Sequence, residues 1–365
     1  TKNIIGNTDI SLNLDIPLNS EDIEFGGFVL FDKTSIESGI PELGLESVSG
    51  EVYFNVNEIW ANNINAMYLG KPVTINVPKI NYSELDFLPF EMTGFFNRQF
   101  IIEQITSFFP KLLSKIDNIR SYFSGDSQWT FKTQKLNKNG IQVANKKIEL
   151  SSDLYGTEIN LPSPLRKSKN QIRPILLETK ISNLTIDKIN INYDNSIFTD
   201  LVIDNDNDSL IRKINIGLGE KHPENKYDNT VSIHGEINNL SFSDWATVTN
   251  TFKTEKNNLK QEKIVSGEIT VKNLEILNKI FNDININFTN SNIDQDWNII
   301  FDGEEIKGTV SYFKKSNNNN DNLNVNLEDL LISKNKNTQN ITDYNINKIP
   351  ELKINIDNFI YKGNK

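Results

Sequence analysis

Few residues of this 365-residue chain combine the types and the spacing that catalysis or metal binding requires. The most metal-like pattern is the run from Asp204 to Asp208, in which aspartate and asparagine alternate as at the start of an EF-hand calcium loop. Such a loop needs Gly at its sixth position and Glu at its twelfth, where this chain has Ser209 and Asn215. We therefore interpret the run as a solvated turn between strands.

Residues suited to nucleophilic or acid–base catalysis are equally scarce. The chain has no cysteine and only two histidines, His222 and His234, and neither has a companion at ligand spacing. The adjacent Glu304 and Glu305 would point to opposite faces of a strand, so they are poor acid–base partners. There is no P-loop and no GxSxG turn. The sequence therefore disfavours an enzyme and predicts no catalytic residue, no cofactor and no metal.

The charge and hydropathy of the chain limit its partners. A net charge of −10 argues against electrostatic binding to nucleic acid or to an anionic lipid surface. No stretch approaches the roughly 20 apolar residues of a membrane-spanning helix, and no signal peptide is present. Because the chain opens at Thr1 in what is already a strand pattern, we expect it to be a piece of a longer protein, with any anchoring segment outside it.

Alternation of apolar and polar residues dominates the chain and predicts a mainly β fold. Such alternation is typical of antiparallel strands with one buried face. The clearest runs begin at Ile10, Val73, Leu184, Ile284, Leu323 and Leu352. A cassette with a glycine at the head of a strand recurs at irregular spacing, at Gly50, Gly235, Gly267 and Gly308. We expect one elongated region over residues 1–365, built as a long, repetitive, curved antiparallel sheet shaped like a groove or gutter.

Helical periodicity is confined to two places. Apolar residues at spacings of three and four predict a helical segment over 98–123, which Pro110 should break in two. A second short helix is expected over 243–252, with Ser243 as its N-cap. Phenylalanines near the first helix have two open interpretations, core packing or contact with an apolar ligand. They are Phe95, Phe96, Phe108 and Phe109.

One segment carries a more specific pattern, a G-x-S-x-W strand followed by SDL-x-G, then LP-x-P and a lysine. Its residues are Gly125, Ser127, Trp129, Ser152, Asp153, Leu154, Gly156, Leu161, Pro162, Pro164 and Lys167. This pattern resembles the YhdP family of AsmA-like bacterial envelope proteins, and residues 9–77 and 284–332 resemble the repeated layers of that family. Physically, Gly156 allows a tight turn, Asp153 can accept backbone N–H groups there, and the prolines end the sheet locally. A fold-defining role is thus favoured over direct ligand contact.

The resemblance implies a location and a role. It implies a periplasmic protein that is anchored in the inner membrane by an N-terminal segment outside this chain, so that membrane contact is made outside it. It also implies involvement in the movement of phospholipid towards the outer membrane. No catalytic residue is carried over from the family.

Three hypotheses follow. The first is a non-enzymatic section of an apolar β-groove that conducts phospholipid, binding acyl chains on one face of the sheet. Its expected lining residues are Ile284, Ile286, Phe288, Leu323, Val325 and Leu327. The second is a structural or regulatory periplasmic scaffold for outer-membrane assembly with a self-filled core. The third is an enzyme or a carbohydrate-binding β-protein. The first two differ only in whether the apolar face is open or packed.

Overall fold

The computed structural model divides into two compact units, each taken by itself below. The first comprises Thr1–Pro110, Ser124–Thr157 and Lys169–Ile189, and the second Lys111–Phe123, Glu158–Ser168 and Asn190–Lys365. The expectation of one elongated region stays a prediction. The residues that the structure describes are 3–16, 24–37, 44–82, 88–108, 120–135, 146–182, 185–203, 211–221, 227–252, 263–290, 296–313, 321–333 and 351–362.

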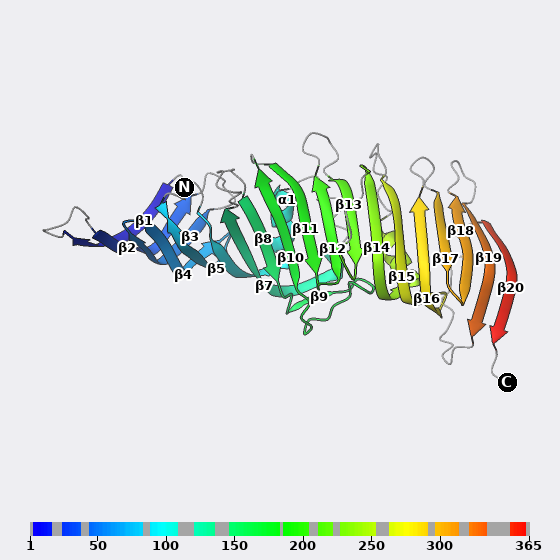
Figure 1. Cartoon of the computed structure of the whole chain (residues 1–365). Coiled ribbons are helices and arrows are strands. Elements are labelled where there is room, and N and C mark those ends of the chain that lie inside the picture. The colour runs from blue at the N-terminus through cyan, green and yellow to red at the C-terminus, as the bar shows by residue number, and fades with distance from the viewer. Residues whose placement is uncertain are drawn as a thin grey trace. The chain divides into compact units, whose positions relative to one another are not determined.

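The first unit is an antiparallel sheet in which strands follow one another in chain order (Figure 1). Its strands are β1 (Asn3–Asp15), β2 (Glu24–Glu37), β3 (Leu45–Asn55), β4 (Glu58–Tyr68), β5 (Lys71–Asn81), β6 (Glu91–Asn97), β7 (Phe123–Lys135), β8 (Lys146–Ser152) and β10 (Ile175–Ser182). A short turn such as the one after Tyr68 joins some antiparallel neighbours directly, whereas residues 98–122 separate β6 from β7.

Helix α1 (Arg98–Phe108) covers part of the apolar face of the first unit. Asn97 caps it, because its Oδ1 accepts the N–H of Phe100 at 2.9 Å. The ring of Phe100 stacks on Phe96 with centroids 4.5 Å apart. Phe96 is buried, whereas its neighbour Phe95 is 65% exposed, because successive residues of β6 point to opposite faces. The side chain of Phe108, together with Phe109 and Pro110, lies outside the described residues.

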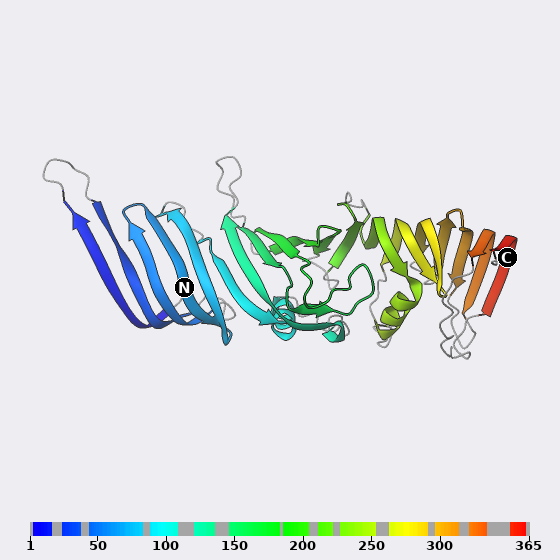
Figure 2. The ribbon, with the colours of Figure 1, turned by 90° about the horizontal axis from the view of Figure 1, so that it is seen from below.

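Shifts of register bend the strands of the first unit. They interrupt the ladders β1–β2, β2–β3, β3–β4 and β4–β5, where an extra residue on one strand faces its partner. Such bulges bend a strand and increase its twist, and Figure 2 shows the blue strands of this unit bent along their length. The register shifts thus accompany the bend of this sheet, and the apolar residues of β1 such as Ile10 stay exposed.

The second unit continues the β architecture with nine strands among its described residues. They are β12 (Ile197–Ile203), β13 (Ile211–Leu218), β14 (Thr230–Ser241), β15 (Ile264–Ile276), β16 (Lys279–Asn290), β17 (Trp297–Asp302), β18 (Ile306–Phe313), β19 (Asn322–Ser333) and β20 (Glu351–Lys362). It also holds the 3-10 turn η4 (Arg120–Tyr122) and helix α3 (Phe242–Phe252). Strands β9 (Thr157–Ile159) and β11 (Thr185–Tyr193) span the divisions between units.

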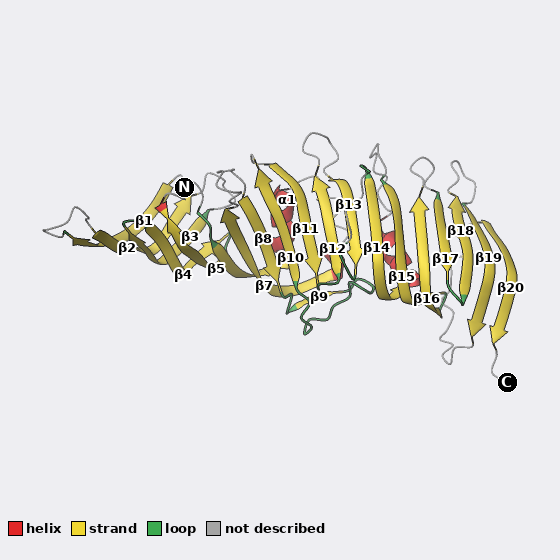
Figure 3. Ribbon diagram, viewed as in Figure 1, coloured by secondary structure: helices red, strands yellow, loops and turns green. Residues whose placement is uncertain are grey.

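The mainly β prediction is confirmed, and strands dominate the chain in Figure 3. Most pairings are antiparallel as expected, but β13–β14, β14–β15 and β19–β20 are parallel. Parallel neighbours need a long crossover connection, and α3 lies in the connection between β14 and β15. Alternation did not reveal this arrangement, because a parallel strand with one covered face alternates in the same way.

Helix α3 begins one residue before the predicted N-cap. Ser241, rather than Ser243, occupies the capping position, and its hydroxyl lies 3.4 Å from the N–H of Asp244. The ring of Phe242 meets Phe301 of β17 edge-on, with centroids 6.4 Å apart. Helix α3 is therefore attached to the apolar face of the second unit. No helix among the described residues is long and apolar enough to cross a membrane.

A glycine of the repeated cassette lies at a register shift in the second unit. The β18–β19 ladder shifts between Lys307 and Gly308, and Gly308 has a φ of +141°. A Cβ at this position would lie 2.4 Å from the carbonyl oxygen of Asn326, so only glycine fits without a shift of the backbone. At this copy of the cassette, the glycine therefore marks a place where the sheet changes register.

On the polar face of the first unit, Lys147 bridges two glutamates that would otherwise repel. Glu149 and Glu178 lie directly opposite each other on β8 and β10, and the Nζ of Lys147 contacts both carboxylates. Hydrogen bonds from Lys147 to Glu149 and then to Glu178 raise the pKa of the ammonium group above its usual value.

We expect Lys147→Met to lower the free energy of unfolding by about 1 kcal/mol at pH 7. Because the pKa of Lys147 is raised by folding, its contribution is fully present below the unfolded pKa of about 10.4 and is lost as the pH rises through the folded pKa. Denaturant unfolding of both proteins between pH 7 and 12 measures this. The difference should shrink at the alkaline end, and a constant difference would contradict the assignment. Lys132→Met, which removes one exposed pair with Glu91, is the control.

Candidate functional site

The first half of the G-x-S-x-W and SDL-x-G pattern forms a close backbone contact in the first unit. Gly125 and Gly156 have φ values of +89° and +92°. A Cβ on Gly125 would lie 2.1 Å from the carbonyl oxygen of Gly156, and a Cβ on Gly156 would lie 2.3 Å from that of Asp126. The turn is held by Asp153, whose Oδ1 accepts the N–H of Tyr155 at 2.9 Å. Glycine is therefore required at both positions.

Hydroxyl groups of the same pattern tie β7 to the turn after β8. The Oγ of Ser152 donates to the carbonyl oxygen of Gln128 at 2.6 Å and accepts the N–H of Leu154 at 3.0 Å. The Oγ1 of Thr157 donates to the Oγ of Ser127 at 3.0 Å, and both are buried. Two apolar members, Trp129 and Leu154, are buried as well. These contacts are structural, since each joins one part of the chain to another.

The LP-x-P half of the pattern lies in the second unit, and its contacts also hold the chain to itself. Backbone hydrogen bonds of 2.8 and 2.9 Å pair Ile159 with Lys167. Lys167 is only 1% exposed, and its Nζ donates to the carbonyl oxygen of Ser168 at 3.0 Å. The indole N–H of Trp245 on α3 donates to the carbonyl oxygen of Ser163 at 2.9 Å. The remaining members, at the turn itself, are Leu161, Pro162 and Pro164.

The apolar face of the second unit is organised in rows that cross the strands. We name as the buried row the residues that lie opposite one another from β13 to β20. They are Leu218, Gly235, Ile269, Ile286, Phe301, Gly308, Leu327 and Ile356. Within it Ile286 is 2% exposed and Phe301 4%. This row belongs to a packed core together with Val271, Leu274 and Ile284, each fully buried.

A second row lies on the same face, two residues away from the buried row on each strand. Its side chains are more exposed to solvent. This half-open row consists of Ile216, Ile233, Gly267, Phe288, Ile299, Val310, Val325 and Ile354. Its members on β16 to β19 are half-buried rather than buried, and Ile354 on β20 is 53% exposed. The side chains of the apolar face are thus buried along one row and partly exposed along the next.

A third row, the rim row, lies two residues beyond the half-open row and combines apolar residues with polar aromatic ones. It runs through Ile214, Val231 and Val265, and through Asn290, Trp297, Tyr312, Leu323 and Leu352. The hydroxyl of Tyr312 is hydrogen-bonded to the carboxylate of Asp321. Burial and the neighbouring carboxylate raise the pKa of Tyr312 to about 12, so the phenol stays neutral at physiological pH.

The structure places all six expected lining residues on this one face but divides them by exposure. Ile284, Ile286 and Leu327 are buried in the core. Phe288, Leu323 and Val325 are half-buried in the two outer rows. Only the second group is partly exposed to solvent, and a lining role stays a prediction.

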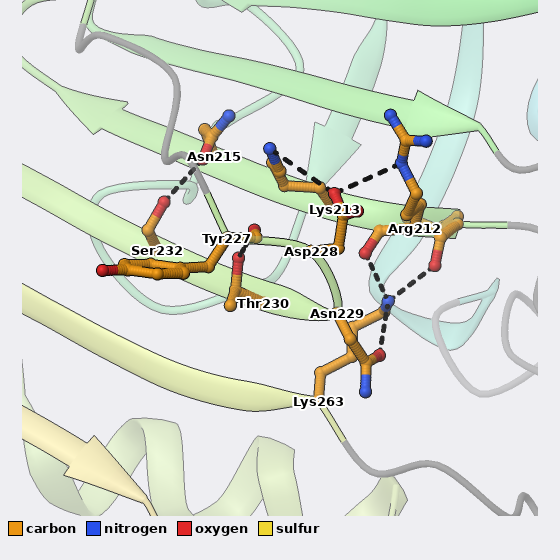
Figure 4. A network of polar contacts seen from close by, with 10 residues as sticks. Arg212, Lys213, Asn215, Tyr227, Asp228, Asn229, Thr230, Ser232 and Lys263 are labelled. Carbon is orange, nitrogen blue, oxygen red and sulfur yellow. Dashed lines mark hydrogen bonds and ion pairs between the residues drawn. The ribbon is translucent and has the colours of Figure 1, made fainter.

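Beyond the rim row, a polar network lies where the three parallel strands β13, β14 and β15 begin (Figure 4). The Nζ of Lys263 donates to the carbonyl oxygens of Ile211 at 2.6 Å and Arg212 at 3.1 Å, and lies 3.4 Å from the Oδ1 of Asn229. Asp228 lies 3.4 Å from the Nε of Arg212. Sequence analysis missed these residues. The available signal was weak, because only Arg212 and Asn229 lie two positions before an alternating apolar run, and parallel pairing brings them side by side.

Among the described residues, no group of three or more acidic or histidine side chains could hold a metal ion. The run from Asp204 to Asp208 and His222 lie outside the described residues. His234 lies in β14, opposite Gly217 and Glu268 of the flanking strands.

Comparison with known proteins decides the family. A family model described as YhdP protein matches residues 2–365. The chain belongs to the YhdP family. No curated protein and no solved structure matches it. In this YhdP-family chain the diagnostic pattern builds turns, and the partly exposed apolar residues of the half-open row lie elsewhere in the sequence.

We expect Gly156→Ala to lower the free energy of unfolding by roughly 3 kcal/mol. About 1 kcal/mol of this reflects a positive φ in a residue with a Cβ, and the rest the clash with the carbonyl oxygen of Asp126. Gly70→Ala is the matched control, because Gly70 has a φ of +73° in the same unit and no atom lies within 4 Å of the place its methyl group would take. Denaturant unfolding compares the two variants, and equal losses would show that the close contact is unimportant.

Proposed function

We propose that this chain is a section of a non-enzymatic YhdP-family envelope protein whose sheet binds phospholipid acyl chains and conducts them between the inner and the outer membrane. The acyl chains lie along the half-open row, under partial cover of the rim row. The proposal places the protein in the periplasm, attached to the inner membrane through a segment outside this chain, with no nucleic-acid partner.

The observation that carries the proposal is the exposure of the half-open row. Four neighbouring strands each contribute one half-buried apolar side chain, Phe288, Ile299, Val310 and Val325. Each methylene of an acyl chain that leaves water for such a surface gains about 0.8 kcal/mol. A continuous apolar row therefore lowers the cost of carrying lipid tails through an aqueous compartment, without any catalytic group.

The alternative is a structural or regulatory scaffold for outer-membrane assembly whose apolar face is filled by its own side chains. The buried row favours this alternative for its part of the face, since Ile286 is 2% and Phe301 4% exposed. The two functions thus differ only in what they predict for the half-open row. A conduit leaves this row accessible to lipid, whereas a scaffold fills it with its own side chains. A test has to address that row and treat the buried row as a reference.

Charged substitutions separate the two functions. Val325→Asp, in the half-open row, should cost about 1–2 kcal/mol of stability, because its carboxylate can reach water, and should abolish lipid occupancy by putting a hydrated charge in the acyl path. Ile286→Asp should cost about 3–5 kcal/mol, because it buries an unpaired charge. The measurements are thermal unfolding and mass spectrometry of lipid that co-purifies from a bacterial envelope.

The control is Asn326→Asp, which adds the same charge on β19 at a position facing the other side of the sheet. It should change neither stability nor lipid occupancy. If Val325→Asp unfolds the protein as Ile286→Asp does, or if the wild-type protein carries no lipid, the conduit is wrong and the scaffold stands.

A further inference from the structure

The alternation of apolar and polar residues in the second unit is interrupted on five strands by a pair of adjacent polar residues between two apolar ones. The pairs are Asn238-Asn239 on β14, Lys272-Asn273 on β15, Asn282-Asp283 on β16, Glu328-Asp329 on β19 and Asp357-Asn358 on β20. Pairs on neighbouring strands lie side by side, because the ladders β14–β15, β15–β16 and β19–β20 each place one member opposite another. We name these five pairs the corner line.

Each pair shifts the phase of the alternation without taking the next apolar residue out of the core. Val271 and Leu274 are both fully buried, although residues three apart on a regular strand point to opposite faces. Phe281 and Ile284 repeat this arrangement on β16, and all four residues belong to one core. Asp283, which the β15–β16 ladder leaves unpaired, has a φ of +52°. The pairs are therefore bulges stacked on neighbouring strands, which bend the sheet along one line.

Apolar residues beyond the corner line pack against those on the side of the buried row. Phe242, which follows β14 beyond its polar pair, meets Phe301 of the buried row edge-on, with ring centroids 6.4 Å apart. Leu274, beyond the line on β15, belongs to the same core as Ile286. The apolar face thus has two walls that are joined at the corner line. The half-open row lies on the wall that also carries the buried row.

Side chains of the polar pairs bridge the strands where the backbone ladder is interrupted. The Nδ2 of Asn273 donates to the carbonyl oxygen of Asn238 at 3.2 Å and to the Oδ1 of Asn239 at 3.1 Å. The backbone N–H and the Nδ2 of Asn282 donate to the Oε2 of Glu305 at 2.7 and 3.0 Å. Backbone groups that the bulges free thus find side-chain partners. Asn273 and Asn282 are exposed, so these bonds lie on the solvent side of the bend.

We infer that the corner line is a hinge whose side-chain bonds hold the two walls at a set opening and so control how well the half-open row retains acyl chains. The inference rests on the proposed function for its ligand and adds what sets the width of the site. Because the bulges are in register, neighbouring strands bend together and the opening changes along the line as a whole. Loss of the bonds loosens the bend without removing any apolar side chain from the core, so the hinge can be tested apart from the packing.

The experiment measures the opening of the walls and the lipid content of the same protein. The chain has no cysteine, so Ile280→Cys with Asn287→Cys creates two unique sites for spin labels. Both residues are exposed and lie on β16 on opposite sides of the corner line. Pulsed electron paramagnetic resonance gives the distance between the labels, and mass spectrometry gives the phospholipid that co-purifies from a bacterial envelope.

The variant is Asn273→Ala with Asn282→Ala, which removes the side-chain bonds of β15 and β16 at the line. The control is Thr270→Ala with Asn285→Ala. It removes a bond of 2.8 Å between exposed side chains of the same two strands, off the corner line. Asn273→Ala alone is the second variant and gives the same test if the double variant does not fold.

We expect the variant to shift the distance between the labels to longer and more broadly distributed values, because a bent strand lengthens as it straightens. The amount of phospholipid per protein should fall, since wider walls leave acyl chains exposed to water. The control should change neither. An unchanged distance in the variant, or an equal change in the control, overturns the hinge. A longer distance with unchanged lipid content overturns its control of the lipid. If the wild type carries no lipid, the proposed function fails, while the distances still decide whether the line holds the walls.

Discussion

The structure depends on how a single layer of strands keeps its apolar face out of water. In the second unit the described strands pair one after another into one sheet, so the apolar face has to be covered by bending and by the short helix α3. The cover is most complete in the core that the buried row shares with Val271, Leu274 and Ile284, whereas the half-open row stays partly exposed. Register shifts such as the one at Gly308 make the bend possible. Everything proposed about ligands concerns the part of the face that this bending leaves accessible.

Parallel pairing gives the second unit an asymmetry that an antiparallel sheet would not have. In an antiparallel sheet, successive strands begin at opposite ends of the sheet, so the residues that precede them lie apart from one another. Here the three parallel strands β13, β14 and β15 begin at the same end of the sheet, so Arg212, Asn229 and Lys263 become neighbours. The crossover that includes α3 makes this possible, and the bond from Trp245 to Ser163 connects that helix to the family pattern. The most diagnostic segment of the sequence thus contacts the helix of this crossover without being part of the polar network.

Much of the fold could be predicted from local patterns. Period-two alternation identified the strands and placed Ile284, Phe288 and Val325 on one face, because side-chain direction depends only on position along a strand. Exposure could not be predicted in this way. Ile286 and Phe288 look equivalent in sequence, and only the neighbouring strands and the bend make one buried and the other accessible. The polar network was missed for the same reason, since its residues are brought together by pairing between segments that are distant in the sequence.

The even spacing of the half-open row has a consequence for motion. Neighbouring strands lie about 4.8 Å apart, and from β16 to β19 each presents one apolar side chain of similar character. An acyl chain that moves from one strand to the next would exchange one hydrocarbon contact for another, so its free energy would change little from step to step. Such a flat profile favours one-dimensional diffusion along the row, in which net flow follows the concentration of lipid at the two ends. Direction would then be imposed by whatever loads and unloads the lipid, rather than by the sheet.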